Sequence, residues 1–262
     1  MWALVTGASS GIGRDMARYL YKMSYNLILV ARNEEALYSL KNDLENNEEN
    51  DKKKIIVIPE DLSNEKNCME LYEKTKDLNP DIVINNAGFG VFGEFSETDL
   101  GTELNLISTN IVAVHILTKL FLKDMLKRNK GNILNVASIA GMEPGPLMAT
   151  YYASKAYVIR LSRAINKEIK KNKSNVNISI LCPGPTNTNF NNVANVVFKS
   201  PSMSSEKVAK YGINKALKGK LIIVPGFLNK CVRFFSKILP DSVLEACAYH
   251  IQRRKSMSRS KV

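Results

Sequence analysis

The chain has 262 residues, 45% hydrophobic and 24% charged, which fits one large globular domain and makes a second full domain unexpected. Its formal net charge of +12 would suit an anionic partner, but the lysines are dispersed and not interleaved with aromatic residues, so we expect no nucleic-acid partner. The four cysteines lack C-x-x-C spacing and the two histidines lie far apart, which predicts reduced thiols and no metal site.

The first residues, Met1 to Thr6, have neither a basic segment nor a cleavable apolar segment, and they are predicted to form the first strand. No apolar run is expected to reach the roughly 18 residues of a membrane-spanning helix, because Lys, Arg and Asn interrupt each candidate. We therefore expect a cytoplasmic protein.

Short runs rich in β-branched residues alternate along the chain with longer amphipathic stretches. The predicted strands are residues 3–5, 27–30, 55–58, 82–84, 133–136, 178–181 and 221–224. The predicted helices include residues 12–23, 34–44, 104–126 and 151–171. This alternation predicts an α/β fold with a doubly wound, mostly parallel, Rossmann-like sheet of about seven strands flanked by helices. The charged run 45–54 is interpreted as a solvated loop.

A glycine-rich loop follows the first strand directly and leads into a helix, with the sequence Thr6-Gly7-Ala8-Ser9-Ser10-Gly11-Ile12-Gly13. Gly7 permits a tight turn, while Gly11 and Gly13 let backbone approach a pyrophosphate and let the helix pack closely on the strand. The helix N-terminus offers N–H groups and partial positive charge to phosphates. The loop therefore predicts a dinucleotide site made by Gly7, Ser9, Ser10, Gly11, Ile12 and Gly13.

The G-x-x-x-G-x-G spacing resembles that of the short-chain dehydrogenase/reductase family. Further motifs match this family in order along the chain: Asp61-Leu62, Asn85-Asn86-Ala87-Gly88, Asn110, Ser138, Tyr151-x-x-x-Lys155 and Pro-Gly-Pro-Thr-Asn-Thr at 183–188. The chain is thus similar to the single-domain, Tyr-x-x-x-Lys type. The resemblance implies an oxidoreductase that interconverts a carbonyl (ketone or aldehyde) and an alcohol.

The predicted catalytic residues are Tyr151, Lys155, Ser138 and Asn110. Tyr151 and Lys155 are four residues apart at the start of a helix, so both side chains project from one face. A nearby ammonium is expected to lower the pKa of the phenol and make proton transfer feasible. The resemblance implies that Lys155 also binds the nicotinamide ribose, that Ser138 stabilises the substrate oxygen, and that Asn110 holds a water in a proton path. Tyr152 is interpreted as packing or pocket lining.

Further cofactor contacts are implied by the resemblance at Asp61, Leu62, Asn86, Ala87, Gly88, Tyr151, Lys155, Pro183, Gly184, Thr186 and Thr188. Asp61 would accept a hydrogen bond from the adenine and Leu62 would press on its ring. An alternative for Asp61 is a helix N-cap.

The residues after the second strand bear on cofactor choice. Ala31 occupies the position where NAD-preferring members of the family carry an acidic residue. Arg32 follows it and could pair with a 2′-phosphate, with Ser9 and Asn33 donating hydrogen bonds. Arg32 could instead be a surface charge flanking a helix. We predict NADP(H) as the cofactor.

The region 190–205 is expected to cover the substrate pocket. Its apolar residues, Phe190, Val193, Val196, Val197, Phe198 and Met203, favour a hydrophobic substrate such as a steroid or an acyl compound. Two other functions stay open: a catalytically silent dinucleotide-sensing binding protein, and a structural scaffold.

The chain is divided into a Rossmann-like catalytic domain, 1–225, and an amphipathic helical extension with a basic tail, 226–262. Residues 228–239 predict one amphipathic helix ended by Pro240, and Ser242 with Glu245 predicts a capping box for a second. The two helices either pack on the body or a neighbouring subunit, which we favour, or make peripheral contact with an anionic membrane. Apolar surface on the helices 104–126 and 151–171 predicts a homodimer or homotetramer.

Overall fold

The computed structural model describes residues 1–46, 53–188, 202–236 and 238–256. A seven-stranded sheet has the order β3-β2-β1-β4-β5-β6-β9, and all its strands pair in parallel. The strands are β1 (Trp2–Thr6), β2 (Asn26–Ala31), β3 (Ile55–Pro59), β4 (Ile82–Asn85), β5 (Asn132–Val136), β6 (Asn177–Leu181) and β9 (Ile222–Ile223). The predicted doubly wound fold is confirmed, and its strand order reverses between β1 and β4, where such folds bind ligands.

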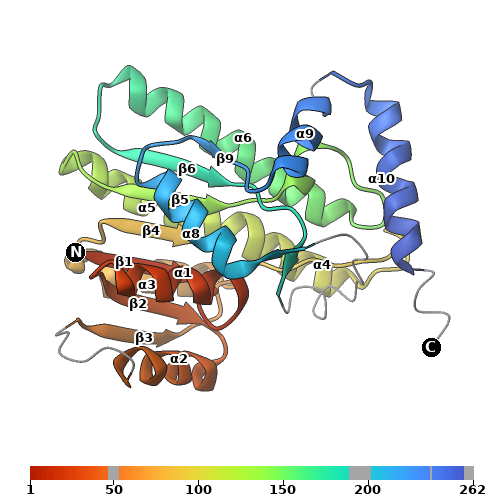
Figure 1. Cartoon of the computed structure of the whole chain (residues 1–262). Helices are drawn as coiled ribbons and strands as arrows, with labels where there is room; N and C mark the ends of the chain where they lie inside the picture. Colours follow the sequence, from red (N-terminus) through yellow and green to blue (C-terminus); the bar gives the residue numbers. More distant parts are fainter. Residues whose placement is uncertain (47–52, 189–201, 237, 257–262) are drawn as a thin grey trace.

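Helices cover both faces of the sheet (Figure 1). One face carries α1 (Gly11–Lys22), α2 (Glu34–Asn46) and α8 (Ser205–Ala216). The other carries α3 (Glu65–Thr75), α5 (Ala113–Lys127) and α6 (Ala149–Lys171). A 3-10 turn, Lys76–Leu78, follows α3, and another, Ile139–Met142, follows β5. All four helices predicted in the first 171 residues are present.

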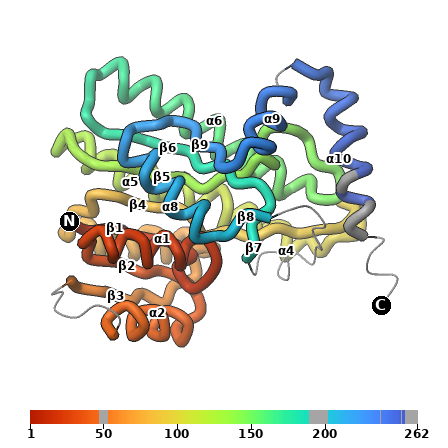
Figure 2. The backbone as a smooth tube through the Cα atoms, viewed as in Figure 1, coloured from red at the N-terminus to blue at the C-terminus, as the bar shows by residue number. Residues whose placement is uncertain are grey.

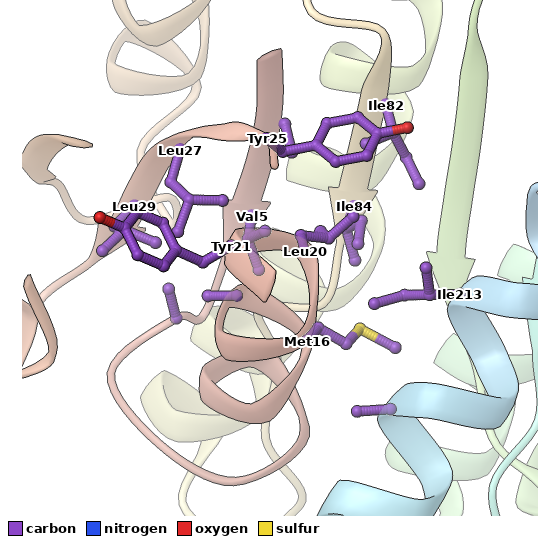
Figure 3. Packing of buried hydrophobic residues seen from close by; sticks show 14 of the residues in the cluster. Val5, Met16, Leu20, Tyr21, Tyr25, Leu27, Leu29, Ile82, Ile84 and Ile213 are labelled. Carbon is purple, nitrogen blue, oxygen red and sulfur yellow. The ribbon is translucent and has the colours of Figure 1, made fainter. Parts of the chain in front are cut away.

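The core beneath α1 shows why these elements pack (Figure 3). Met16 and Leu20 of α1 lie against Val5 of β1, Ile84 of β4 and Ile213 of α8, and all five side chains are buried. Burying each such side chain contributes roughly 1.5–3 kcal/mol. The carboxyl ends of the central strands are thereby held on a rigid scaffold.

One continuous helix connects α4 (Leu100–Ile107), a π turn (Ser108–Val112) and α5. Within the described residues it is the one helix that is long and apolar enough to cross a membrane, with 28 residues and a mean hydropathy of 1.4. The expectation that no apolar run reaches such a length was therefore wrong, because Glu103 is the only charged residue between 100 and 118. Val114, Leu117 and Phe121 pack in the core, and 39% of the apolar window is buried.

Two short strands that the sequence analysis did not predict lie beyond the main sheet (Figure 2). β7 (Thr186–Asn187) pairs in parallel with β8 (Met203–Ser204). This pairing ties the loop after β6 to the start of α8, where the Ser204 hydroxyl accepts a hydrogen bond from Lys207 N at 3.2 Å.

The C-terminal extension contains α9 (Phe227–Phe235) and α10 (Asp241–Ser256). α10 buries Leu244, Ala248 and Gln252, whereas none of the residues of α9 is buried. The predicted capping box at Ser242 is wrong, because α10 already begins at Asp241 and the Leu244 N–H bonds to Pro240 O at 3.3 Å.

Candidate active site

The glycine loop between β1 and α1 has the backbone expected of an anion-binding loop. Gly7 (φ +66°) and Gly11 (φ +55°) adopt left-handed conformations, and a Cβ on Gly13 would lie 2.3 Å from Gly7 O. Ser10 caps α1 without a side-chain hydrogen bond, and the first turn of α1 holds no acidic residue. The Ser10 side chain therefore leaves the backbone N–H groups of this turn uncapped, and no carboxylate within the turn competes with a phosphate for them.

The end of β4 is tied to this loop by Thr6 and Asn86. Thr6 Oγ1 accepts hydrogen bonds from Asn86 N at 2.9 Å and Ala87 N at 3.0 Å. Asn86 Nδ2 donates to Thr6 O at 3.0 Å and to Gly7 O at 3.3 Å. The sequence analysis did not identify Thr6 as a site residue; its position directly before Gly7 was the available signal.

Asn110 lies in the π turn and is fully buried (0% exposed). Its Nδ2 donates to Phe89 O at 2.9 Å and to Ser154 Oγ at 3.1 Å, and its Oδ1 accepts from Phe89 N at 3.1 Å. A Cβ on Gly88 would lie 2.6 Å from Asn110 Oδ1 and 3.4 Å from Lys155 Nζ. Asn110, Gly88 and Lys155 thus meet at one point beyond the ends of β4 and β5.

Lys155 projects from the first turns of α6 into the interior and is only 5% exposed. Its Nζ donates to Val136 O at 3.1 Å and lies 5.7 Å from the centroid of the Tyr151 ring. Burial lowers the pKa of Lys155 to about 8. Lys155 is therefore still mostly protonated at neutral pH.

Tyr151 and Ser138 form a hydrogen bond, which joins α6 to the end of β5. Ser138 Oγ also accepts from Ala140 N at 3.1 Å and donates to Pro183 O at 3.3 Å. Burial raises the pKa of Tyr151 to about 12, against the opposing effect of the Ser138 hydrogen bond. The expected lowering of this pKa was wrong for this arrangement, because burial is the dominant cause and the only opposing one is the Ser138 hydrogen bond. Tyr151 is protonated at neutral pH, which suits a proton donor.

The neighbouring Tyr152 faces a different way. Its hydroxyl accepts a hydrogen bond from Gln252 Nε2 of α10 at 2.7 Å. Burial raises the pKa of Tyr152 above its ordinary range, with a further contribution from the nearby Glu143 carboxylate. This placement agrees with its interpretation as a packing residue.

The structure places the two predicted adenine contacts, Asp61 and Leu62, in different surroundings. Asp61 Oδ1 accepts a hydrogen bond from Ser63 N at 3.0 Å, but the N-cap of α3 is Asn64. The N-cap alternative for Asp61 was therefore wrong. Leu62 is 5% exposed and packs in the core under α3, so its side chain has little surface with which to press on an adenine ring.

Arg32 is exposed at the end of β2, and no ion pair of Arg32 is found among the described residues. Asn33 Oδ1 accepts from Ala36 N at 2.8 Å and so caps α2. A guanidinium in this position is available to a phosphate, while the Asn33 oxygen is already engaged.

The loop after β6 closes over the glycine loop. A Cβ on Gly11 would lie 3.1 Å from Thr188, and one on Gly184 would lie 2.2 Å from Asn229 Oδ1 of α9. Thr186 Oγ1 donates to Gly184 O at 2.9 Å. Ile139 N bonds to Pro183 O at 3.0 Å, which connects this loop to the 3-10 turn after Ser138. Asn229 was not identified from the sequence.

Only one of the apolar residues predicted to cover the pocket is among the residues that the structure describes. Phe190, Val193, Val196, Val197 and Phe198 lie outside the described residues, and only Met203, in β8, is placed. The prediction of an apolar pocket stays a prediction.

The residues fit a nicotinamide dinucleotide: an anion-binding helix end, an exposed guanidinium at the end of β2, and a buried lysine beside a partly exposed tyrosine at the topological switch point. A doubly wound sheet with such a site defines a dinucleotide-dependent oxidoreductase. The family model described as short chain dehydrogenase matches residues 1–196. The chain belongs to the short-chain dehydrogenase family.

The chain is 35% identical to the very-long-chain 3-oxoacyl-CoA reductase of Mycosarcoma maydis over 182 residues, 69% of this chain and 51% of that protein. It spans about half the length of this relative. It is 34% identical to a very-long-chain 3-oxoacyl-CoA reductase-like protein of Arabidopsis thaliana, over 98% of this chain and 83% of that protein. Among solved structures, a short-chain dehydrogenase from Sphingobium yanoikuyae in complex with NADPH has the same fold, with a TM-score of 0.80 and 23% identity over 91% of this chain and 95% of that one.

Proposed function

We propose that the chain is an NADP(H)-dependent enzyme that interconverts a carbonyl and an alcohol on a hydrophobic substrate, with 3-oxoacyl compounds as the first class to test and steroids as the second. The observation that carries the proposal is the Ser138–Tyr151 hydrogen bond beside the buried Lys155. The names of the similar proteins support the 3-oxoacyl class. The cytoplasm is the expected location.

The bound nicotinamide would supply or accept a hydride at the substrate carbon. In the reducing direction, Tyr151 is protonated and gives its proton to the carbonyl oxygen as negative charge develops there. Ser138 donates a hydrogen bond to the same oxygen. Lys155 places a positive charge beside the phenolate that is left on Tyr151. Asn110 holds the backbone of Phe89 in place, next to Gly88, against which the Lys155 ammonium lies.

Replacement of the phenol tests this assignment. Tyr151→Phe removes only the hydroxyl and is expected to reduce turnover about 100-fold or more while NADPH affinity stays close to wild type. Turnover is measured by steady-state assays with 3-oxoacyl, steroid and small carbonyl panels, and NADPH affinity is measured by fluorescence titration. Tyr152→Phe is the matched control. Loss of turnover in Tyr152→Phe but not in Tyr151→Phe would refute the assignment, and NADPH binding without oxidation on any panel would favour the silent sensor.

The preference for NADP(H) rests on Arg32. Arg32→Ala is expected to raise the KM for NADPH several-fold more than the KM for NADH, because only NADPH carries the 2′-phosphate. Lys66→Ala, which removes an exposed cation from α3, is the control. Equal effects of Arg32→Ala on both cofactors would show that Arg32 is a surface charge.

We also infer a homodimer or homotetramer. Leu104, Leu126 and Tyr157 are exposed large apolar side chains on α4, α5 and α6, which a second copy would cover. A monomeric mass by light scattering at micromolar concentration would contradict this inference.

A further inference from the structure

The helix α9 is strongly amphipathic. Six of its nine residues, in the sequence Phe-Leu-Asn-Lys-Cys-Val-Arg-Phe-Phe, are apolar. At the angular spacing of an α-helix they gather on one side, whereas Asn229, Lys230 and Arg233 lie on the other. Such a helix normally turns its apolar side to the protein core.

In this structure the polar side of α9 contacts the body. Asn229 Nδ2 donates to Pro225 O at 2.7 Å, and Asn229 Oδ1 lies against Gly184 in the loop that flanks the site. Burial raises the pKa of the Cys182 thiol to about 12, and the positive charge of Arg233 opposes this rise. The Arg233 side chain is therefore directed toward the body. Two of the three polar residues of α9 therefore face the catalytic domain.

The apolar side consequently faces outward. Phe227 is 79% exposed, Leu228 71%, Phe234 59% and Phe235 52%. Together with Val232 these residues form what we term the α9 face. We expected both C-terminal helices to pack their apolar stripes on the body or on a neighbouring subunit. Within one copy of the chain, α10 buries Leu244 and Ala248 of its stripe but exposes Val243, and α9 buries none of its residues. Figure 1 shows α9 and α10 beyond the end of the sheet to which the central strands point.

We propose that the α9 face inserts into the surface of an anionic lipid membrane. Residues 226–262 carry eight Lys and Arg against two acidic residues, and the whole chain has a net charge of +12. Lys230, on the flank of the face, is exposed. Phenylalanine and leucine on one side of a helix with basic residues beside them are the composition of helices that lie in the membrane interface.

A second copy of the chain fits this face less well. Five partly exposed side chains offer on the order of 500 Å² of surface, below the roughly 800 Å² per partner of a stable interface. A symmetric pair would also bring two segments of the same positive charge together. A lipid surface of opposite charge needs no minimum contact area of this kind, because the electrostatic attraction adds to the burial of the rings.

Docking through α9 would turn the carboxyl ends of the strands, and the loop at Gly184, toward the lipid. An apolar substrate dissolved in the membrane would then meet the site without crossing water. This consequence rests on the proposed function, whereas the docking itself does not.

Vesicle co-sedimentation of the full chain tests the proposal. We expect binding at low salt to phosphatidylcholine vesicles that contain phosphatidylglycerol, and at least tenfold weaker binding to phosphatidylcholine alone or at high salt. The double variant Phe234→Ser/Phe235→Ser is expected to bind at least tenfold more weakly, because both rings are exposed and leave the interface. Tyr38→Ser, an exposed aromatic residue on α2 at the opposite end of the molecule, is the matched control and should bind as wild type.

Thermal unfolding and NADPH binding of the double variant verify that it is folded. Three results would overturn the proposal: no sedimentation of wild type with anionic vesicles at low salt, equal sedimentation of wild type and double variant, or equal losses in the double variant and Tyr38→Ser. A larger particle for wild type than for the double variant in light scattering without lipid would assign the face to a second copy instead. Failure of the carbonyl assays alone would leave the vesicle result unaffected, so the two proposals fail separately.

Discussion

The side chain of Asn110 makes three hydrogen bonds in a fully buried environment, and its removal gives a quantitative test of the site's architecture. A neutral intramolecular hydrogen bond contributes about 1 kcal/mol net, so Asn110→Ala is expected to lower the free energy of unfolding by about 3 kcal/mol. For a domain of this size that corresponds to a Tm lower by roughly 6–12 °C. The Phe89 backbone, which loses two of the three bonds, should also release the Gly88 segment and raise the KM for NADPH.

The neighbouring Thr109 provides the control. Its hydroxyl makes a single long contact of 3.4 Å with Asn105 Oδ1, so Thr109→Ala is expected to change Tm by less than about 2 °C. Asn110→Asp keeps the acceptor for Phe89 N but turns a carboxylate oxygen toward Phe89 O. Its Tm should therefore be close to that of Asn110→Ala and not to that of wild type. Thermal unfolding by circular dichroism at neutral pH measures all three. Equal Tm values for Asn110→Ala and Thr109→Ala would refute the reasoning.

Two further substitutions probe the remaining parts of the site. Lys155→Met should abolish turnover yet be more stable than wild type at pH 7, because it removes a buried cation. Burial lowers the pKa of Lys155 from 10.5 to about 8, so the native state loses this proton at lower pH than the unfolded chain. The stability difference between variant and wild type should therefore shrink between pH 8 and 10.5. Urea unfolding at pH 7 and 10 checks both, and an advantage that grows with pH would contradict the assignment. Gly13→Ala places a Cβ 2.3 Å from Gly7 O and 2.4 Å from Asn86 Nδ2, so NADPH binding by fluorescence titration should fall at least tenfold, whereas Gly101→Ala at the start of α4 should leave it unchanged.

Local patterns predicted most of the fold. The central strands are buried on both faces and so form continuous apolar runs in the sequence. The glycine loop and the Tyr151–Lys155 spacing are each contained within a few residues. The pKa of Tyr151 was not predictable in this way, because it depends on Ser138, which the fold brings to it, and on packing in the cluster around Met148 and Phe92. The orientation of α9 was not predictable either: periodicity defines its apolar face, but contact of Asn229 with Gly184 decides which face turns outward. Leu62 occupies the position of the family's adenine contact, yet its side chain packs in the core under α3.

The π turn at Ser108–Val112 has a consequence for how the length of this helix can change. A π turn holds one residue more than a regular helical turn, and such insertions cluster at functional positions. Deleting one residue here would restore a regular α-helix. Because the widened turn accommodates the extra residue, α4 and α5 would keep their rotation about the helix axis. Buried Leu106 on α4 and buried Phe121 on α5 would then both still face inward, but the turn that carries the buried Asn110 side chain to Phe89 and Ser154 would be lost. The extra residue therefore serves the Asn110 site and not the packing of the helix, and chains that lack this site should be able to lose the residue without repacking α4 or α5.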